Sequence, residues 1–496
     1  MKKRLESITW AATSALLTAT IFLATISGYG IAQAQSQSDA TAQESSEKAA
    51  TTDDYYELMS VFVDTFQQID RNYVKDVNRR DLIDAAIRGM LAELDPYSNY
   101  ISPDDVERFK EAITQEFGGV GIRVNFDNQM RALEVTSPIP GSPAYRAGIK
   151  SGDRIVEIDR QPVRDFPVAR ELEKAVELLR GLPGSEVEVS VRRVGTGEVE
   201  YMKLKREQIQ LDTVLGYSYR DKDKWNFMLD EEKKIGYIRL THFNLRSAGE
   251  MREALKSLRR EGMKGLILDL RFNPGGQLQA AIDIADLFIE NGEIVRTEGR
   301  NSTPRNYPAK RFGTFTGFPM AVLINRFSAS ASEIVSACLQ DHDRAIVVGE
   351  RSWGKGSVQH VIELNTSGDS QLKLTTASYF RPSGKNIHRF PNAKEEDEWG
   401  VMPSDGFEIK FNRDEMDNFQ EDRRLRDIVD PQEPYVGKFV DTQLDKAIEY
   451  ISQQLSDDPP PPKPDAPEEP TTEKATQDAE ASLRLPFLRI PRRDVG

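Results

Sequence analysis

Short, almost wholly apolar segments recur along residues 234–348, and stretches with helical periodicity separate them. A strand that is apolar throughout has to be buried on both faces, which is typical of a parallel sheet covered by helices. The pattern therefore predicts an α/β fold with a buried, largely parallel sheet and functional turns at the carboxyl ends of its strands. The predicted strands are 234–240, 265–270, 320–324 and 345–348, and the predicted helices lie near 247–262, 277–290 and 331–341.

Two regions of different character precede this part of the chain. Residues 53–114 carry apolar residues at helical spacing, which predicts an N-terminal helical region. This region either covers a neighbouring domain or pairs with a second copy of the chain, and the sequence leaves both roles open. Residues 115–207 predict a compact module, and the α/β domain is expected to span residues 208–455. The module's predicted strands are 119–124, 132–136, 154–158 and 187–192, and its predicted helix is 168–179.

The two ends of the chain have the compositions of a signal and a tail. A basic start, an apolar stretch and the A-x-A sequence Ala32-Gln33-Ala34 predict a signal peptide over residues 1–34, followed by a polar linker over 35–52. The signal is either removed or kept as a membrane anchor, and in both cases a periplasmic or other extracytoplasmic location is expected. Residues 456–496 are rich in proline and acidic residues, which predicts a disordered tail.

Charge and cysteine content exclude several classes of partner. The formal net charge of −14 disfavours nucleic acid as a partner, because an acidic surface repels a phosphate backbone. Cys338 is the only cysteine, so neither an internal disulfide nor a zinc site made of cysteines can form. No metal or cofactor is expected.

Ser330 and Lys355 are the candidate catalytic pair. Ser330 lies among small residues at the predicted start of a helix, and Lys355 lies between two glycines, so a serine nucleophile with a lysine base is indicated. A lysine can act as a base only when neutral, and burial away from carboxylates such as Asp341 and Glu350 would lower its pKa from about 10.4. A serine–histidine–aspartate triad is less attractive, since none of the four histidines has a recognisable catalytic setting.

Further residues complete the predicted site. Gln359 can orient the Lys355 amine without adding charge. The backbone N–H groups of Gly276 and Ala331 are the candidate oxyanion donors, because both belong to turns at which strands give way to helices. The neighbouring serines compete with Ser330 as nucleophile, but Ser328 enters the turn and Ser332 lies in the first helical turn, where a hydroxyl tends to bond the backbone.

Three motifs together resemble those of the carboxyl-terminal processing, or tail-specific, serine peptidases. They are Asp269-Leu-Arg-Phe-Asn-Pro-Gly-Gly276, Ser328-Ala-Ser-Ala-Ser-Glu333 and Gly354-Lys-Gly-Ser-Val-Gln359, and the resemblance spans about residues 55–450. It implies a crotonase-like (ClpP/crotonase) α/β core with an inserted PDZ domain over residues 115–207. It also implies that Ser330 is the nucleophile, Lys355 the general base and Gln359 its orienting partner.

The resemblance extends to the middle module and to its ligand. Gly119-Val120-Gly121-Ile122 resembles a carboxylate-binding loop, whose N–H groups would hold the C-terminus of a peptide. The expected substrates are therefore exported proteins or peptides with free apolar C-termini. The charged insertion 393–399 and the acidic tail depart from the family pattern, so an adaptor protein remains a candidate partner.

The expected function is a serine endopeptidase that processes or degrades proteins from their C-terminal tails. A catalytically silent PDZ scaffold on the same core is the alternative, and a crotonase-like acyl-CoA enzyme is a second one. Intact Ser330, Lys355, Gln359 and Gly276 argue against the scaffold. An acyl-CoA enzyme would have no use for a carboxylate-binding module.

Overall fold

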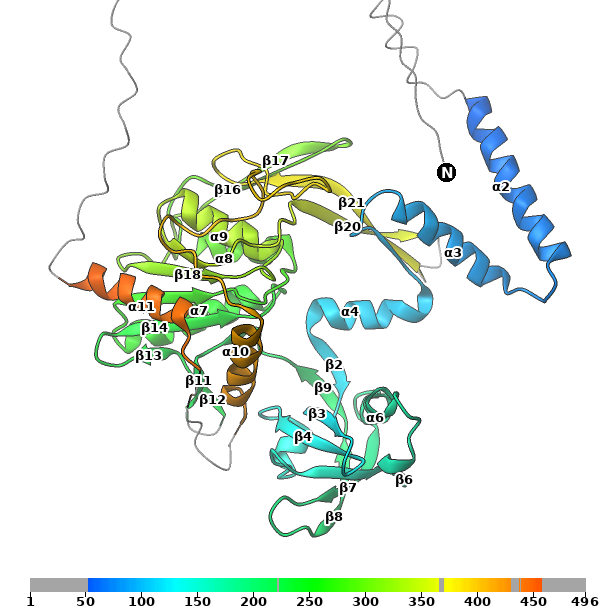
Figure 1. The fold of residues 1–496 in the computed structure, drawn as a ribbon, viewed down its shortest axis with the longest axis horizontal. Helices are drawn as coiled ribbons and strands as arrows, with labels where there is room; N and C mark the ends of the chain where they lie inside the picture. Colours follow the sequence, from blue (N-terminus) through cyan, green and yellow to red (C-terminus); the bar gives the residue numbers. More distant parts are fainter. Residues whose placement is uncertain (1–51, 221–222, 365–369, 430–436, 438, 457–496) are drawn as a thin grey trace, which may run out of the picture. The chain divides into compact units, whose positions relative to one another are not determined.

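The structure is a computed structural model that describes residues 52–220, 223–364, 370–429, 437 and 439–456 (Figure 1). The predicted signal peptide, nearly all of the predicted linker and the tail from residue 457 lie outside the described residues. Contacts divide the chain into two compact units, with the boundary between Ile87 and Arg88.

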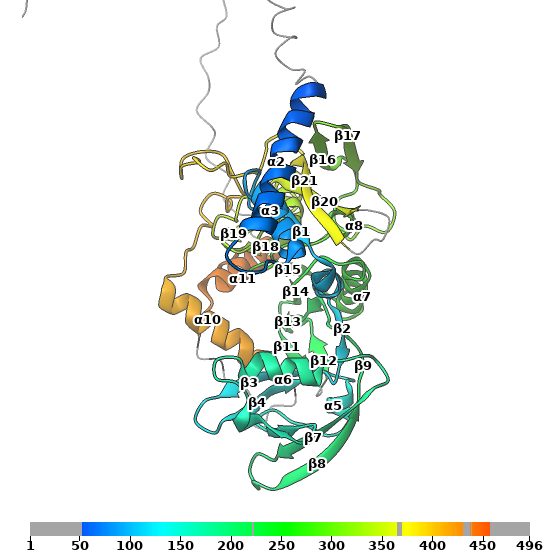
Figure 2. The same cartoon turned by 90° about the vertical axis from the view of Figure 1, so that its right-hand side faces the viewer.

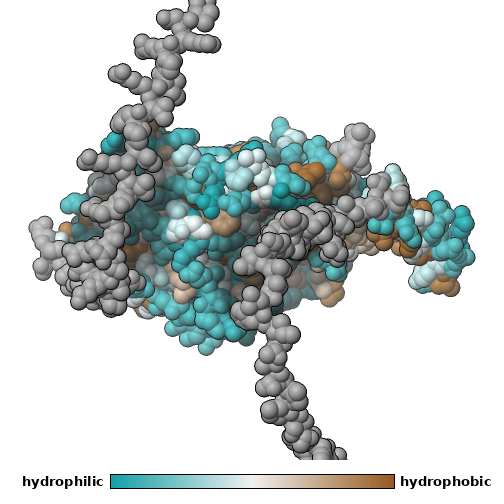
Figure 3. Space-filling model, turned by 90° about the horizontal axis from the view of Figure 1, so that it is seen from above, coloured by the Kyte–Doolittle hydropathy of each residue, from teal (hydrophilic) through white to brown (hydrophobic). Residues whose placement is uncertain are grey.

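The first unit contains helix α2 (Thr52–Asn72) and most of α3 (Arg79–Ala92). These helices confirm the prediction of helical structure here. Apolar side chains lie exposed on α2, among hydrophilic residues (Figure 3). Within the described part of the chain, no helix combines the length and apolarity that crossing a membrane requires. The large apolar residues of α2 that are exposed are Tyr55, Tyr56, Leu58, Met59, Val61, Phe62, Val63 and Ile69.

A six-stranded sheet forms the centre of the second unit (Figure 1). Its strand order is β10-β14-β15-β18-β19, with β13 paired to β14, and the four strands β14, β15, β18 and β19 run parallel. This confirms the predicted parallel sheet. The strands are β10 (Val214–Leu215), β13 (Met228–Asp230), β14 (Ile235–Leu240), β15 (Gly265–Asp269), β18 (Met320–Ile324) and β19 (Ile346–Gly349).

Helices cover both faces of this sheet, which is why its strands are almost wholly apolar. Alternate residues such as Ile238 and Leu268 pack with α7 (Ser247–Arg260), α8 (Leu278–Asp286) and α9 (Ala331–Asp341) in one core. The residues between them, such as Tyr237, Ile267 and Leu323, pack with Leu444, Ala447 and Ile451 of α11 (Thr442–Leu455) in a second core. Side chains of successive strand residues point to opposite faces, so every position of β14, β15 and β18 is buried.

A second, antiparallel sheet was not predicted. Its order is β1-β21-β16-β17, with β20 also paired to β21, so a strand from before the module joins strands from within the α/β domain (Figure 2). Its members carry many half-exposed polar residues, which hides the strand signal. The strands are β1 (Asn99–Ile101), β16 (Glu293–Gly299), β17 (Ser302–Pro308), β20 (Ser357–Leu364) and β21 (Ser370–Phe380).

The middle module is a separate antiparallel sheet with its own core. The strand predicted over residues 119–124 exists as β3 but begins only at Ile122: β2 ends at Gly119, and Gly121, with a φ of +76°, turns the chain between the two strands. The predicted helix begins at Glu171 rather than 168. The module's elements are β2 (Glu116–Gly119), β3 (Ile122–Asp127), β4 (Ala132–Pro138), α5 (Pro143–Arg146), β5 (Arg154–Ile158), β6 (Gln161–Pro162), η2 (Val163–Asp165), α6 (Glu171–Leu179), β7 (Glu186–Arg192), β8 (Val199–Lys205) and β9 (Glu207–Gln210).

The remaining elements connect these parts. A short 3-10 turn and a helix lead from β1 into the module, and a small hairpin and another helix flank the central sheet. They are η1 (Pro103–Asp105), α4 (Val106–Thr114), β11 (Ser218–Arg220), β12 (Lys224–Asn226) and α10 (Arg413–Arg426).

Candidate active site

Ser330 lies at the start of α9, in a sharp turn that follows the carboxyl end of β18. Its φ of +56° and ψ of −112° are unusual for a residue with a side chain, and such strain persists only where neighbouring structure enforces it. The two competing hydroxyls are already engaged, because Ser328 Oγ donates to Leu270 O at 2.8 Å and Ser332 Oγ donates to Asn273 O at 2.9 Å. Among the described residues, the Ser330 hydroxyl donates no hydrogen bond.

The Asn273–Gly276 turn packs directly against the Ser330 turn. Ala329 N donates to Asn273 O at 3.0 Å, and a Cβ added to Gly275 would lie 2.8 Å from Ser330 Cβ, so a side chain there would push the turns apart. The N–H groups of Gly276 and Ala331 have no acceptor in the described chain. Two unpaired donors therefore line the same cavity as Ser330, and an oxyanion hole requires donors of this kind.

One cavity of about 480 Å³ collects the predicted catalytic residues. Ser330, Lys355, Gln359, Gly276 and Ala331 all line it. Much of the remaining wall is apolar and includes residues of α4, a helix that sequence analysis assigned only to the N-terminal region. The other lining residues are Phe109, Ala112, Ile113, His242, Phe243, Gln277, Leu278, Ile334, Ser357, Val358, His360, Val361, Lys373 and Tyr379.

Lys355 is half-buried, and in the described chain its amine has no salt-bridge partner and no hydrogen bond. Burial lowers its pKa below the usual 10.5, and the positive charge of Lys373 adds to the decrease. The charges of Glu333 and Asp95 oppose these effects without cancelling them. The Tyr97 ring, whose centroid lies 5.1 Å from Nζ, also flanks the amine. A substantial neutral fraction is therefore expected at a lower pH than for an exposed lysine.

The carboxylates that act on the Lys355 pKa are not the two that the sequence suggested, Asp341 and Glu350. Glu350 is paired with Arg326 at 2.7 Å, and Asp341 is paired with Arg381 at 2.6 Å. Trp353, two residues before Lys355, is 49% exposed and does not line the cavity.

Glu333 joins the turn that carries Ser330 to the loop that carries Lys355, a role that sequence analysis missed. Its buried carboxylate accepts hydrogen bonds from the backbone N–H groups of Ser330 (2.7 Å), Gly354 (2.6 Å) and Lys355 (2.8 Å) and from Ser352 Oγ (2.6 Å). Burial raises its pKa, and these hydrogen bonds oppose the increase. The sequence did contain a signal, since Ser330-x-x-Glu333 fits the capping-box pattern.

Tyr379 makes a second connection between the same two segments. Its buried hydroxyl lies within hydrogen-bonding distance of the carbonyl oxygens of Ser330 and Lys355, which share its single O–H. No hydrogen bond joins Ser330 Oγ to Lys355 Nζ within the described residues; catalytic hydrogen bonds are often long or poorly aligned in sites without substrate.

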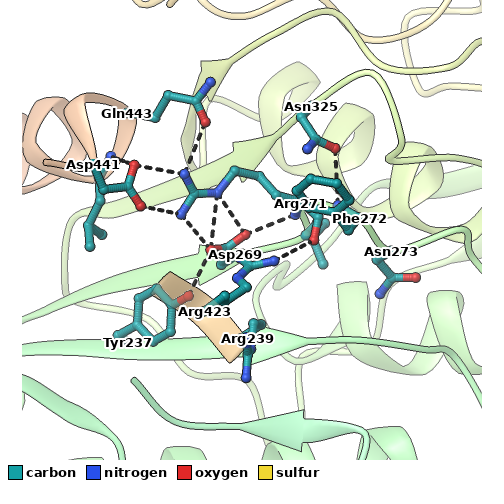
Figure 4. A network of polar contacts seen from close by, with 12 residues as sticks. Tyr237, Arg239, Asp269, Arg271, Phe272, Asn273, Asn325, Arg423, Asp441 and Gln443 are labelled. Carbon is teal, nitrogen blue, oxygen red and sulfur yellow. Dashed lines mark hydrogen bonds and ion pairs between the residues drawn. The ribbon is translucent and has the colours of Figure 1, made fainter. Parts of the chain in front are cut away.

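A buried polar network supports the Asn273–Gly276 turn from behind (Figure 4). Asp269, at the end of β15, accepts hydrogen bonds from Arg271 Nη2 at 2.7 Å, Arg423 Nη2 at 2.5 Å and Tyr237 Oη at 2.7 Å. Arg271 also pairs with Asp441 at 2.8 Å. The network thereby ties the start of the turn to α10 and to the start of α11.

The predicted carboxylate-binding loop has unpaired donors of its own. The N–H groups of Val120 and Gly121 have no acceptor in the described chain, while Gly121 O accepts from Ser142 Oγ at 2.9 Å. A Cβ at Gly121 would lie 2.2 Å from Ser142 Cβ, so only glycine fits this turn. Gly119 and Ile122 flank the turn as the last residue of β2 and the first of β3.

Comparisons with known proteins place the same regions in known families. Residues 234–394 match the sequence model of peptidase family S41, residues 134–193 match that of the PDZ domain, and residues 20–105 match that of the activating protease CtpB N-terminal domain. The first match lies inside the predicted core (208–455) and the second inside the predicted middle module (115–207). The third runs from the predicted signal peptide through the linker into the N-terminal helical region.

Individual relatives are similar over most of their length. The carboxy-terminal-processing protease of Bartonella bacilliformis is 37% identical over 337 residues, which are 67% of this chain and 73% of that protein. The carboxyl-terminal-processing protease of Picosynechococcus sp. is 34% identical over 386 residues, which are 76% of this chain and 81% of that protein. A solved photosystem II D1 C-terminal processing protease is 27% identical, with a TM-score of 0.38 over 70% of this chain and 92% of that one.

Proposed function

Because the chain belongs to the carboxy-terminal processing serine proteases of peptidase family S41, we propose that Ser330, Lys355 and Gln359 catalyse peptide-bond hydrolysis at this cavity. The observation that carries the proposal is the convergence of one uncommitted hydroxyl, one unpaired amine and two unpaired N–H groups on the same cavity. Acyl transfer requires a nucleophile, a base and donors to the oxyanion, and the hydroxyl, the amine and the N–H groups can supply these in turn.

The steps follow from these positions. The neutral Lys355 amine takes the proton of Ser330 Oγ, and the oxygen attacks the carbonyl carbon of the scissile bond. The N–H groups of Gly276 and Ala331 stabilise the negative charge that develops on the carbonyl oxygen. The Lys355 ammonium then gives its proton to the leaving amine, and a water activated by the same amine releases the acyl group from Ser330. Gln359 orients the amine without holding a proton on it.

We also propose that the PDZ domain selects substrates by a free, apolar C-terminus. The unpaired N–H groups of Val120 and Gly121 support the capture of a carboxylate, and Gly119 and Ile122 frame that loop. The half-buried side chains of β3 and of α6 support apolar selection, since a peptide that adds to β3 would lie between these two elements. The apolar wall of the catalytic cavity fits apolar residues at the cleavage point.

An unstructured substrate that ends in apolar residues tests both parts of the proposal. Amidation of its C-terminus removes the charge that the Val120–Gly121 loop would bind, so KM is expected to rise about tenfold or more while kcat changes little. A substrate with a free but acidic C-terminal residue serves as the control for side-chain selection. Equal KM values for the free and amidated substrates would contradict carboxylate capture, and no cleavage of any substrate would favour a catalytically silent scaffold.

The pH dependence tests the role of Lys355 as the base. Because the base has to be neutral, kcat/KM is expected to rise with pH through the Lys355 pKa. Lys373→Met removes a positive charge that lowers this pKa, so the rising limb should move to higher pH. Lys410→Met is a matched control, because Lys410 is exposed and paired with Glu408 at 2.9 Å. If the rising limb of the pH profile moves equally in Lys373→Met and Lys410→Met, or in neither, the result contradicts Lys355 as the titrating base.

Three wider features complete the proposal. The core is proposed to be crotonase-like, supported by the helix-covered parallel sheet with its active turns at the strands' carboxyl ends. Export to the periplasm or another extracytoplasmic site is supported by the sequence of residues 1–34, whether the signal is removed or retained.

Two copies are proposed to pair through the exposed apolar side chains of α2. Light scattering of the full chain should report a dimer, and light scattering of the Phe62→Glu variant should report a monomer.

A further inference from the structure

Gln359 is held by two hydroxyl groups of the β20–β21 pair. Its side-chain Nε2 donates to Ser357 Oγ at 2.9 Å and to Thr375 Oγ1 at 3.2 Å. A primary amide has only two N–H donors, so these bonds use both of them. The amide oxygen is not engaged by any donor of the described chain, and it is therefore the atom left to accept a hydrogen bond from the Lys355 amine.

Thr375 is in turn fixed by a residue from a distant part of the sequence. Thr375 N donates to Ser98 Oγ at 3.1 Å, and Ser98 Oγ lies 3.4 Å from Thr375 Oγ1. The hydroxyl of Ser98 also donates to Asp95 Oδ2 at 2.8 Å, and Asp95 Oδ1 accepts from the backbone N–H groups of Tyr97 and Ser98 at 2.7 Å each. The Asp95–Ser98 turn is thus locked by its own carboxylate.

Strand pairing brings this turn to the site. β1 pairs antiparallel with β21, so that Asn99 lies opposite Lys373, and Gln359 lies opposite Thr375 on the other side of β21. Tyr100 and Ile101 are buried, with 5% and 4% of their surfaces exposed, which anchors β1 on this sheet.

We propose that Ser98 and Thr375 are positioning residues that hold the Gln359 amide in its working orientation. The Asp95–Ile101 segment, which precedes the PDZ domain in sequence, is then a structural part of the active site. This inference rests on the proposed role of Gln359 as the partner of Lys355. It gives a function to the pairing of β1, which lies outside the region that matches the peptidase family, with β21 of the antiparallel sheet.

Neither residue reaches the substrate's reacting atoms in this account. Loss of the Thr375 hydroxyl leaves one amide N–H without its acceptor and lets the amide rotate, so that its N–H₂ group can face the amine instead of its oxygen. The chemical step then slows, while substrate capture is unchanged. A purely structural role would instead lower stability, and would act independently of Gln359.

A double-mutant cycle on the full-length protein separates these possibilities. Steady-state cleavage of the unstructured substrate is measured for Thr375→Val, Ser98→Ala, Gln359→Ala and the Gln359→Ala/Thr375→Val double variant. Thr375→Val is expected to lower kcat about tenfold with KM within about twofold, and Ser98→Ala to lower it less. The double variant should be no slower than Gln359→Ala alone, and Thr375→Ser should restore most of the loss.

Thr376→Val is the matched control, because successive side chains of a strand point to opposite faces and Thr376 contacts His360 rather than Gln359. Its kcat is expected to stay within about twofold of the parent. Equal losses in Thr375→Val and Thr376→Val, or multiplied losses in the double variant, would overturn the inference while leaving the proposed peptidase function intact. An unchanged kcat in Gln359→Ala would overturn the role of Gln359 and, with it, the positioning roles of Ser98 and Thr375. An inactive parent protein would overturn the proposed function itself.

Discussion

Ser330→Ala is expected to lower kcat by roughly 10⁴- to 10⁶-fold, because it removes the only hydroxyl of the turn that is free to attack a carbonyl. The fold should persist, since Ser330 is held through its backbone: Ser330 N donates to Glu333 and Ser330 O accepts from Tyr379. Lys355→Met should cause a loss of similar size, because Lys355 and Ser330 act as one unit. Active-site titration and steady-state cleavage by the full-length protein measure both losses.

Ser328→Ala and Ser332→Ala are the matched controls for Ser330. Their hydroxyls donate to the backbone oxygens of Leu270 and Asn273, so their removal should cost stability but leave kcat within about tenfold of the parent. Near-complete inactivation of a folded Ser328→Ala or Ser332→Ala variant, with activity retained in Ser330→Ala, would move the nucleophile to that residue.

Asp269→Asn is expected to lower the free energy of unfolding by about 3–5 kcal/mol, because it removes the buried carboxylate that Arg271 and Arg423 share. Arg271 is 3% exposed and Asp269 is fully buried, so water cannot replace the lost partner (Figure 4). The Asn273–Gly276 turn should loosen as well, and kcat should fall with stability. Calorimetry of the full chain, with kcat measured well below the unfolding temperature, reports both effects.

The pH dependence of the same network has a definite sign. Although burial of Asp269 favours the neutral acid, the charges of Arg271 and Arg423 outweigh burial and hold its pKa below the usual value. A carboxyl with a lowered folded-state pKa contributes stability above its unfolded pKa of about 4, and loses that contribution as the pH falls below it. Glu449→Gln, in the exposed Lys446–Glu449 pair of α11, is the control and should change stability by less than about 0.5 kcal/mol. Equal stability of Asp269→Asn and the parent would contradict this account of the network.

The parallel sheet could be predicted because its strands are almost wholly apolar, with charged residues only near their carboxyl ends, such as Arg239 and Asp269. Short runs such as Ile235–Leu240 and Met320–Ile324 have the length of strands, and their burial on both faces accounts for their composition. The antiparallel sheet could not, since β20 and β21 carry half-exposed polar residues and β1 pairs with a strand that lies far from it in sequence. Local patterns do not encode which distant strand is the partner.

The same distinction separates the predicted from the missed site residues. Small residues mark the turns in which the backbone can approach a substrate closely, and these turns contain Ser330, Lys355, Gly276 and Ala331. The structure brings all four residues to one cavity together with Gln359. Tyr379 and Thr375 lie in β21, whose sequence carries no motif. Their roles depend on tertiary contacts to Lys355 and Gln359 respectively. Glu333 is intermediate, because its capping pattern was visible but its bonds to Gly354 and Lys355 were not.

The titration of Lys355 tests the central claim most directly. Competitive trace acetylation of the full-length Ser330→Ala protein across a pH series, read out by mass spectrometry on each lysine-containing peptide, yields the pKa of every amine. The account predicts that Lys355 titrates below the ordinary lysines of the same sample, and that Lys373→Met moves it toward them. A Lys355 amine that titrates with or above the exposed lysines would contradict a neutral base and, with it, the proposed mechanism.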